Sequence, residues 1–173
     1  MPCVDVKISG TAVTDELIRE IETKFTKVLQ VTIAPQFPTN LGYPKDSELW
    51  KKGHAFTLNM MPGWTWVTVS DARWAVGGKQ RSEDIVARVH ILVLKEALTA
   101  ENMQDIVSNI EVCAAEILGQ FGKKVHLFVD CTEGEVDMTL PRELFSDYIG
   151  DASHKLLKVP DIVVYLRRSI GDF

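Results

Sequence analysis

The sequence predicts an α+β fold in which a strand-helix-strand unit occurs twice, the two units sharing one four-stranded mixed sheet with both helices on one face. Two observations predict it. The 173 residues partly repeat after a shift of 85 positions, and each copy opens with alternating apolar residues. We expect one domain over residues 1–173, with units at about 2–80 and 85–135, an insertion at 31–63 and a C-terminal extension at 136–173.

The first strand of each unit is marked by apolar residues at every second position. A period of two places such residues on one face of a strand, which is the face that packs on the core. The repeated positions are Val4, Val6 and Ile8 in the first copy and Val89, Ile91 and Val93 in the second.

A helix is predicted after each of these strands. Thr14 and Thr99 lie 85 positions apart, and each is followed two places later by a glutamate. A threonine hydroxyl can cap the first free N–H groups of a helix, and a carboxylate is favoured near the positive helix end. One face of each helix is apolar at helical spacing: Ile18, Ile21, Phe25, Val28 and Leu29, then Met103, Ile106, Val107, Ile110, Cys113, Ile117 and Leu118.

The second strands are predicted at 64–71 and 124–131, ending in Asp71 and Asp130. Strands joined through a helix are normally parallel, with a right-handed crossover. We expect the sheet face away from the helices to be apolar and to be covered by another subunit. The long connection at 31–63 either folds over a pocket beside the sheet or decorates the surface.

The composition excludes several classes of function. The net charge is −5 and no block of lysines or arginines occurs, so we expect no nucleic-acid or membrane partner. Without a secretion signal or an apolar membrane span, a cytoplasmic protein is expected. The 3 cysteines lack CxxC spacing and the 4 histidines lack HxH or HxxxH spacing, so neither a disulfide framework nor a metal site is indicated.

Two histidines and one cysteine are expected to have structural roles. His90 and His126 lie inside apolar strand-like runs, which favours a hydrogen-bonded imidazole over a metal ligand. Cys113 lies on an apolar helix face and is expected to pack there. Cys3 and Cys131 are weaker candidates for a reactive thiol.

Pro2 has two interpretations. A proline is tolerated as the first residue of a strand because it has no N–H to offer. Methionine is usually removed before a small second residue, however, and Pro2 would then carry a free secondary amine. Burial lowers the pKa of such a group towards neutrality, where it can act as a base. If Met1 is retained, the nitrogen is an amide without basicity.

The order of these features resembles the tautomerase superfamily. A Met-Pro start precedes a strand, the strand-helix-strand unit is repeated, and WVTVSD is followed by Trp74 and Gly77-Gly78, as a strand, acidic residue, aromatic residue and Gly-Gly follow one another in the 4-oxalocrotonate tautomerase group. The doubled length is similar to the fused branch, which includes the macrophage migration inhibitory factor and cis-3-chloroacrylic acid dehalogenase groups. VTVSDARWAVGGKQRSEDIVARVHIL is nearest in layout to the dehalogenase group.

The resemblance implies a function and an assembly. The family base is an N-terminal proline, here Pro2, which moves a proton in keto-enol isomerisation or acts as an acid while water adds to an unsaturated acid. Substrates in the family are small 2-oxo or unsaturated carboxylates, and no cofactor is used. A homotrimer is expected for the same reason.

Several family positions differ in this chain. Ala12 and Leu98 stand where the family has arginines that hold the substrate carboxylate, and only Lys95 keeps a cation nearby. A histidine of the dehalogenase group falls on Leu29, and its water-activating glutamate falls on Asp130. The candidate catalytic residues are therefore Pro2 and Asp130, with Lys95 as a candidate carboxylate holder.

The remaining candidates each carry two interpretations. Arg73, Arg81 and Arg88 either complete a carboxylate clamp or are solvated at strand edges. Trp66 and Trp74 match positions that wall the pocket of smaller tautomerases, or else they fill the core. The leading hypothesis is a cofactor-independent tautomerase, followed by a hydratase or dehalogenase. The alternative from another class is a catalytically inactive oligomeric binding protein.

Overall fold

The computed structural model describes residues 2–40, 42–76, 79–80, 83–94 and 98–134. The predicted extension at 136–173, and with it the proposal of one domain over the whole chain, lies outside this part. The elements run in the order β1 (Cys3–Ser9), α1 (Asp15–Ile33), α2 (Gln36–Asn40), α3 (Glu48–Trp64), β2 (Trp66–Asp71), β3 (Ala75–Val76), β4 (Lys79–Gln80), β5 (Ile85–Leu94), α4 (Ala100–Gly119) and β6 (Val125–Gly134).

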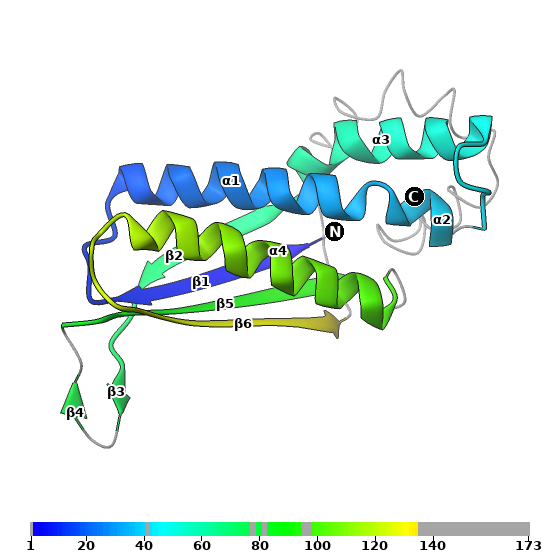
Figure 1. Ribbon diagram of the computed structural model, residues 1–173. Helices are drawn as coiled ribbons and strands as arrows, with labels where there is room; N and C mark the ends of the chain where they lie inside the picture. The colour runs from blue at the N-terminus through cyan, green and yellow to red at the C-terminus, as the bar shows by residue number, and fades with distance from the viewer. Residues whose placement is uncertain (1, 41, 77–78, 81–82, 95–97, 135–173) are drawn as a thin grey trace. The chain divides into compact units, whose positions relative to one another are not determined.

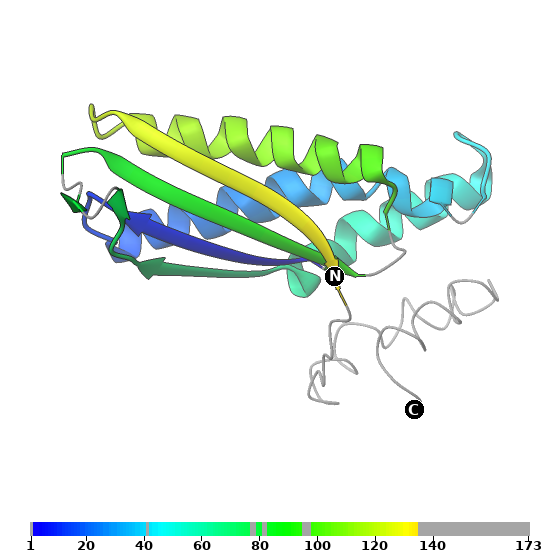
Figure 2. The same cartoon turned by 90° about the horizontal axis from the view of Figure 1, so that it is seen from below.

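Four strands form one mixed sheet in the order β2-β1-β5-β6. Each unit contributes a parallel pair, β1 with β2 and β5 with β6, and the two units meet where β1 and β5 run antiparallel. Figure 2 shows these four strands side by side. The predicted α+β fold with two strand-helix-strand units in one sheet is therefore confirmed.

The two long helices, α1 and α4, lie together on one face of the sheet (Figure 1). Thr14 caps α1 by accepting a hydrogen bond of 3.3 Å from the Leu17 N–H. Thr99 caps α4 by accepting one of 3.2 Å from the Asn102 N–H, and the Asn102 side chain accepts one in return from the Thr99 N–H. Both helices therefore begin where the repeated threonines predict.

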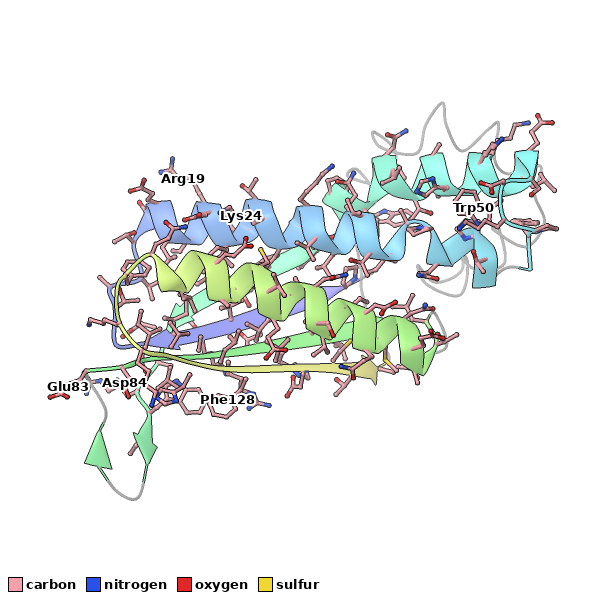
Figure 3. All side chains as sticks on the ribbon, viewed as in Figure 1. Arg19, Lys24, Trp50, Glu83, Asp84 and Phe128 are labelled. Carbon is pink, nitrogen blue, oxygen red and sulfur yellow. The ribbon has the colours of Figure 1, made fainter. Side chains whose placement is uncertain are left out.

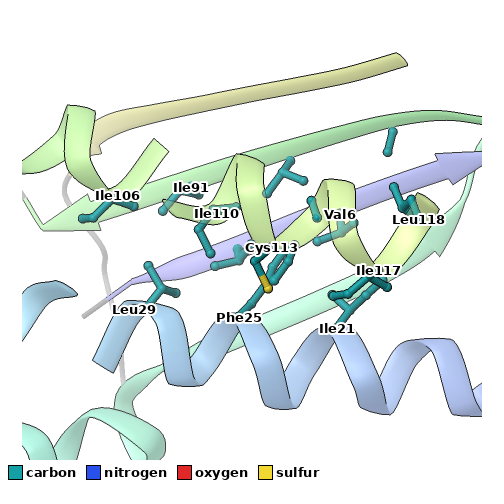
Figure 4. Packing of buried hydrophobic residues seen from close by; sticks show 14 of the residues in the cluster. Val6, Ile21, Phe25, Leu29, Ile91, Ile106, Ile110, Cys113, Ile117 and Leu118 are labelled. Carbon is teal, nitrogen blue, oxygen red and sulfur yellow. The ribbon is translucent and has the colours of Figure 1, made fainter. Parts of the chain in front are cut away.

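The core lies between these helices and the sheet, and it repeats with the same shift of 85 residues (Figure 4). In both helices the buried positions lie at a spacing of about one turn, as an amphipathic helix requires. The matched buried residues are Leu17 and Asn102, Ile21 and Ile106, Phe25 and Ile110, Leu29 and Ala114, and Ile33 and Leu118. The strand residues predicted to face the core are all buried as well.

The insertion forms two helices on the helical side of the sheet (Figure 1). Ser47 caps α3 by accepting from the Trp50 N–H, and the buried Trp50 indole donates a 2.9 Å hydrogen bond to Thr39 in α2. Gln30 of α1 donates to the carbonyl of Leu58 in α3. The connection is thus anchored to α1, and it leaves the other face of the sheet uncovered.

A short hairpin of β3 and β4 follows β2. Ala75 pairs with Gln80 and Val76 with Lys79, and the hairpin projects on the side of the sheet opposite the helices (Figure 1). The Gly77-Gly78 dipeptide of the sequence pattern lies outside the described residues.

The prediction of an apolar sheet face away from the helices is wrong. This face, termed the open face below, is mixed: most of its side chains are polar, but it also carries the exposed Trp66 and Phe128, and Figure 3 shows the labelled Phe128 side chain on this side. The polar members are Asp5, Lys7, Thr68, Ser70, Arg88, His90, His126, Asp130 and Thr132. The face is therefore not the continuous apolar surface that the prediction of a covering subunit assumed.

The prediction that Asp71 and Asp130 end matching strands is also wrong. Asp71 pairs with Ile8 at the end of β2, whereas β6 continues to Gly134 and Asp130 pairs with His90 within the strand. Asp130 consequently presents its carboxylate from the middle of a strand.

Candidate functional site

Pro2 lies immediately before β1 and is buried. Its carbonyl accepts a 3.1 Å hydrogen bond from the Trp66 N–H, which ties the start of β1 to the start of β2. A proline fits here because it precedes the first paired residue of β1, Cys3, where an N–H is not needed for strand pairing. The backbone of Trp66 therefore lies beside Pro2, but its side chain, 50% exposed, is on the open face with Thr68 and not on the buried side with Pro2.

Arg73 and Trp74 lie at the opposite end of the sheet. They follow Asp71, which pairs with Ile8 near the end of the 7-residue strand β1. At about 3.3 Å per residue, this end is roughly 20 Å from Pro2. One chain therefore does not bring Arg73 or Trp74 to Pro2, and Lys95 and Arg81 lie outside the described residues.

Asp130 lies at the centre of a polar cluster on the open face. Arg88 of β5 donates to its carboxylate from Nη2 at 3.2 Å, and Nδ1 of His90 bonds the other carboxylate oxygen. Arg88 and His90 are two residues apart, so the alternation of the strand places both on the same face. Asp130, His90 and Arg88 therefore form one connected ion-pair cluster across β5 and β6.

Lys7 and Asp5 extend this cluster onto β1. The Lys7 ammonium lies 3.3 Å from the Asp5 carboxylate, which also accepts a 3.1 Å hydrogen bond from the Thr68 hydroxyl. Asp5 is the register partner of His90. Asp5, Lys7, Arg88 and His90 line a hollow of about 200 Å³, termed the open-face pocket below.

The surroundings of Asp130 favour its charged form. Partial desolvation raises its pKa, but hydrogen bonds from His90 and Arg88 outweigh this, so the net pKa lies below the ordinary value of an aspartate. Because Nδ1 of His90 is bonded to Asp130, Nε2 is the ring nitrogen that remains for a second partner. The hydroxyl of Thr132 lies 3.5 Å from Nε2.

A second histidine-carboxylate pair lies at the other end of the same strands. Nε2 of His126 lies 2.9 Å from the Asp84 carboxylate. Hydrogen-bonded imidazoles were predicted for both His90 and His126, and this is confirmed. Their side chains are 35% and 31% exposed, however, so both serve the open face and not the core.

The cysteines are unsuited to thiolate chemistry. Desolvation raises the pKa of Cys3, and desolvation together with Asp130 and Glu133 raises the pKa of Cys131 to about 11. Since the thiolate is the reactive form, both thiols are held in the unreactive state at neutral pH. Cys113 is buried on α4, as predicted.

Sequence reasoning gave Asp130 and Arg88 but missed Asp5 and Lys7, and it assigned His90 a structural role. The signal was present, because Asp5 and Lys7 alternate with core residues in CVDVKIS, and Arg88 and His90 do so in VARVHIL. The expectation of an apolar open face is incompatible with these polar residues.

Two further kinds of site were sought among the described residues. They contain no group of three or more His, Cys, Asp or Glu side chains arranged to hold a metal ion. None of the described helices has both the length and the apolar character needed to cross a membrane.

Comparison with known proteins gives matches in structure only. No family model matches the chain, and no curated protein matches it by sequence. Among solved structures, N1, a member of the cis-3-chloroacrylic acid dehalogenase family, is 13% identical with a TM-score of 0.51, over 91% of this chain and 99% of that chain. Native RhCC from Rhodococcus jostii RHA1 is 15% identical with a TM-score of 0.50, over 79% and 81%.

A third solved structure is described as a fused 4-OT symmetric trimer. It is 13% identical with a TM-score of 0.49, over 81% of this chain and 92% of that chain. At these identities the likeness to the dehalogenase family member and to RhCC shows the fold. The chain thus has the fold of the tautomerase superfamily, as the sequence resemblance predicts.

Proposed function

We propose that this protein is a cofactor-independent enzyme of the tautomerase type, with Pro2 as the general base. The observation that carries the proposal is the buried position of Pro2 at the start of β1, in a chain with the tautomerase fold. A free secondary amine in a desolvated position loses its proton more readily than one in water, because burial disfavours the charged form. Such an amine can remove a proton from carbon at neutral pH.

The proposed substrate is a small 2-oxo or unsaturated carboxylate. Lys95 would hold the carboxylate. The Trp66 side chain lies on the open face, so it would wall the pocket only from a neighbouring subunit. Arg73 and Trp74 follow β2 at the end of the sheet opposite Pro2. A role for them therefore requires this end of a neighbouring subunit to lie against Pro2. A homotrimer would bring the two ends together, and Arg81 is a further candidate cation.

The test begins with an intact-mass measurement, which shows whether Met1 has been removed. It continues with an assay of phenylenolpyruvate ketonisation.

Insertion of an alanine between Met1 and Pro2 turns the ring nitrogen into an amide and changes no existing side chain. We expect this variant to lose about 10²- to 10⁴-fold in rate, the range for a general base. Pro62→Ala, at an exposed position of α3, is the matched control. Equal rates for the processed chain and the insertion variant would refute the proposal.

Addition of water to an unsaturated acid is the second candidate reaction. It requires a carboxylate that orients water, and Asp130 is the candidate because its lowered pKa keeps it ionised. Asp130 lies on the open face and Pro2 on the buried side of β1, so this reaction requires a neighbouring subunit to bring an Asp130 to Pro2. Incubation with a 3-haloacrylate and measurement of halide release tests this reaction. Release that survives Asp130→Asn would remove the assignment.

A non-enzymatic binding protein is the candidate from another class. It is favoured by the separation of Pro2 from Arg73 and Trp74 within one chain. If the native protein retains Met1, the basic nitrogen does not exist and this alternative replaces the enzyme. A processed chain that ketonises phenylenolpyruvate excludes it.

A further inference from the structure

We propose that the open-face pocket is a second ligand site, separate from Pro2, for a small carboxylate that also bears a hydroxyl group. Its lining is contributed by two residues of β1, Asp5 and Lys7, and two of β5, Arg88 and His90. The pocket thus combines two cationic side chains with two hydrogen-bond acceptors. A hydroxy acid presents the complementary pair, a carboxylate and a donor.

The two cations keep donors available for a ligand carboxylate. In the described part of the chain, Lys7 pairs with Asp5 at 3.3 Å and Arg88 pairs with Asp130 at 3.2 Å. An ammonium has three N–H donors and a guanidinium five, so one ion pair leaves most of them unused. Their side chains are 49% and 51% exposed, so a ligand can reach them from solvent.

The acceptor side of the pocket argues for a hydroxyl group on the ligand. His90 bonds Asp130 through Nδ1, which leaves Nε2 for a second partner. A ligand hydroxyl can either donate a hydrogen bond to a ring nitrogen or accept one from it, and it can also donate to the Asp5 carboxylate, which only accepts. The Thr132 hydroxyl is the nearest protein donor, and at 3.5 Å it bonds Nε2 only weakly.

The size of the pocket limits the ligand. A volume of about 200 Å³ is smaller than the roughly 300–1,000 Å³ of sites for drug-sized molecules. It equals the share of about seven liquid waters at roughly 30 Å³ each. A four-carbon hydroxy acid fits these limits, and a nucleotide does not.

The register separates this site from Pro2. Pro2 is two residues before Val4 and shares the buried side of the strand, whereas Asp5 lies on the open face. Three residues separate Pro2 from Asp5, which is about 10 Å along a strand. A ligand of this size cannot contact both positions, so the open-face pocket acts independently of the proposed base.

The test is a titration of the full chain with L-malate and with succinate, which differ by one hydroxyl, followed by amide NMR and calorimetry. We expect L-malate to shift the signals of Lys7, Arg88 and His90. Succinate should bind about tenfold more weakly, because it lacks the hydroxyl that makes the hydrogen bond to His90. Equal affinity for the two acids would overturn the assignment of His90 Nε2 to the ligand hydroxyl.

Matched variants locate the site. Arg88→Gln and His90→Gln should each weaken L-malate by about tenfold, since each removes a hydrogen bond to the ligand. Lys123→Gln and His126→Gln, which change a cation and an imidazole outside the pocket, should leave the affinity unchanged. The alanine insertion before Pro2 should also leave it unchanged. Loss of binding in that insertion variant, or unchanged binding in Arg88→Gln, would overturn the proposal whatever the ketonisation assay shows.

Discussion

The two strand-helix-strand units share a core but differ on the open face. Matched positions 85 residues apart are buried in both helices, from Leu17 and Asn102 to Ile33 and Leu118. Asp5 and His90 are also matched positions, and they are register partners across β1 and β5. The line of internal symmetry therefore passes through the open-face pocket.

The chemistry diverges at this point of symmetry. In the first unit Asp5 faces Thr68 of β2 and accepts its hydroxyl at 3.1 Å. In the second unit His90 faces Asp130 of β6 and bonds its carboxylate. At matched positions, a carboxylate thus accepts from a hydroxyl in the first unit and bonds an imidazole in the second. Packing constrains the core positions alike in both units, whereas the open face is free to differ.

The largest expected effect tests the equivalence of the two helices. Phe25→Ala should lower the free energy of unfolding by about 3–5 kcal/mol and Ile110→Ala by about 2–5 kcal/mol, because both create cavities at matched, fully buried positions. Urea denaturation measures both. Phe128→Ala is the control, since Phe128 is 61% exposed on the open face. A comparable loss for that control would contradict burial as the cause of the losses at Phe25 and Ile110.

The next effect compares two glycines with positive φ, Gly10 in the loop after β1 and Gly122 in the loop after α4. Gly10 has φ of +83° and a Cβ there would lie 2.0 Å from the Asp84 carbonyl oxygen, whereas Gly122 has φ of +64° with no atom within 4 Å of such a Cβ. Gly122→Ala should cost about 1–2 kcal/mol from backbone strain alone. Gly10→Ala should cost about 1–3 kcal/mol more, because the loop must also shift. Equal midpoints in urea would contradict this account.

A smaller effect compares the two helix starts. Thr14→Ala and Thr99→Ala should each lower the free energy of unfolding by about 1 kcal/mol, because each leaves a helix N–H without its capping hydroxyl. Thr14→Ser and Thr99→Ser keep the hydroxyl and should be near wild type. Thermal unfolding of the four variants measures the difference. A serine variant as unstable as its alanine partner would show that the cap is not the cause.

Most of the fold could be predicted because the core repeats its pattern. Two threonines 85 positions apart marked the helix starts, and Val4, Val6 and Ile8 marked a strand whose copy is also buried. The boundaries of the second strands could not be predicted, because Trp64 and Thr65 suit a strand as well as the end of α3.

The candidate site could be predicted only in part. Asp130 was found through a family position, but its partner His90 was not, because the pairing of β5 with β6 is set by register and not by local sequence. Residues such as Asp5 and Lys7 acquire meaning only once β1 is placed beside β5. Long-range strand pairing is therefore what separates the predictable core from the less predictable open face.

The smallest expected effect concerns the charge that distinguishes the second unit. The pKa of Asp130 is lowered in the folded state, so its interactions stabilise the fold above the ordinary aspartate pKa of about 3.9 and are lost as the pH falls through the lower folded value. Asp130→Asn should therefore flatten the acid limb of a plot of urea midpoint against pH.

Arg88→Gln, which removes one of the two hydrogen bonds to Asp130, should flatten that limb less than Asp130→Asn does. Asp130 is half exposed, and solvent screening keeps the effect of its ion pairs small. Because Arg88 and His90 stabilise the same ionised carboxylate, the midpoints of the three proteins should converge at low pH, where Asp130 is protonated. If the acid limb of the plot is unchanged in Asp130→Asn, the charged cluster contributes nothing to the stability of the fold. The second unit then differs from the first only in the side chains that it presents to a ligand.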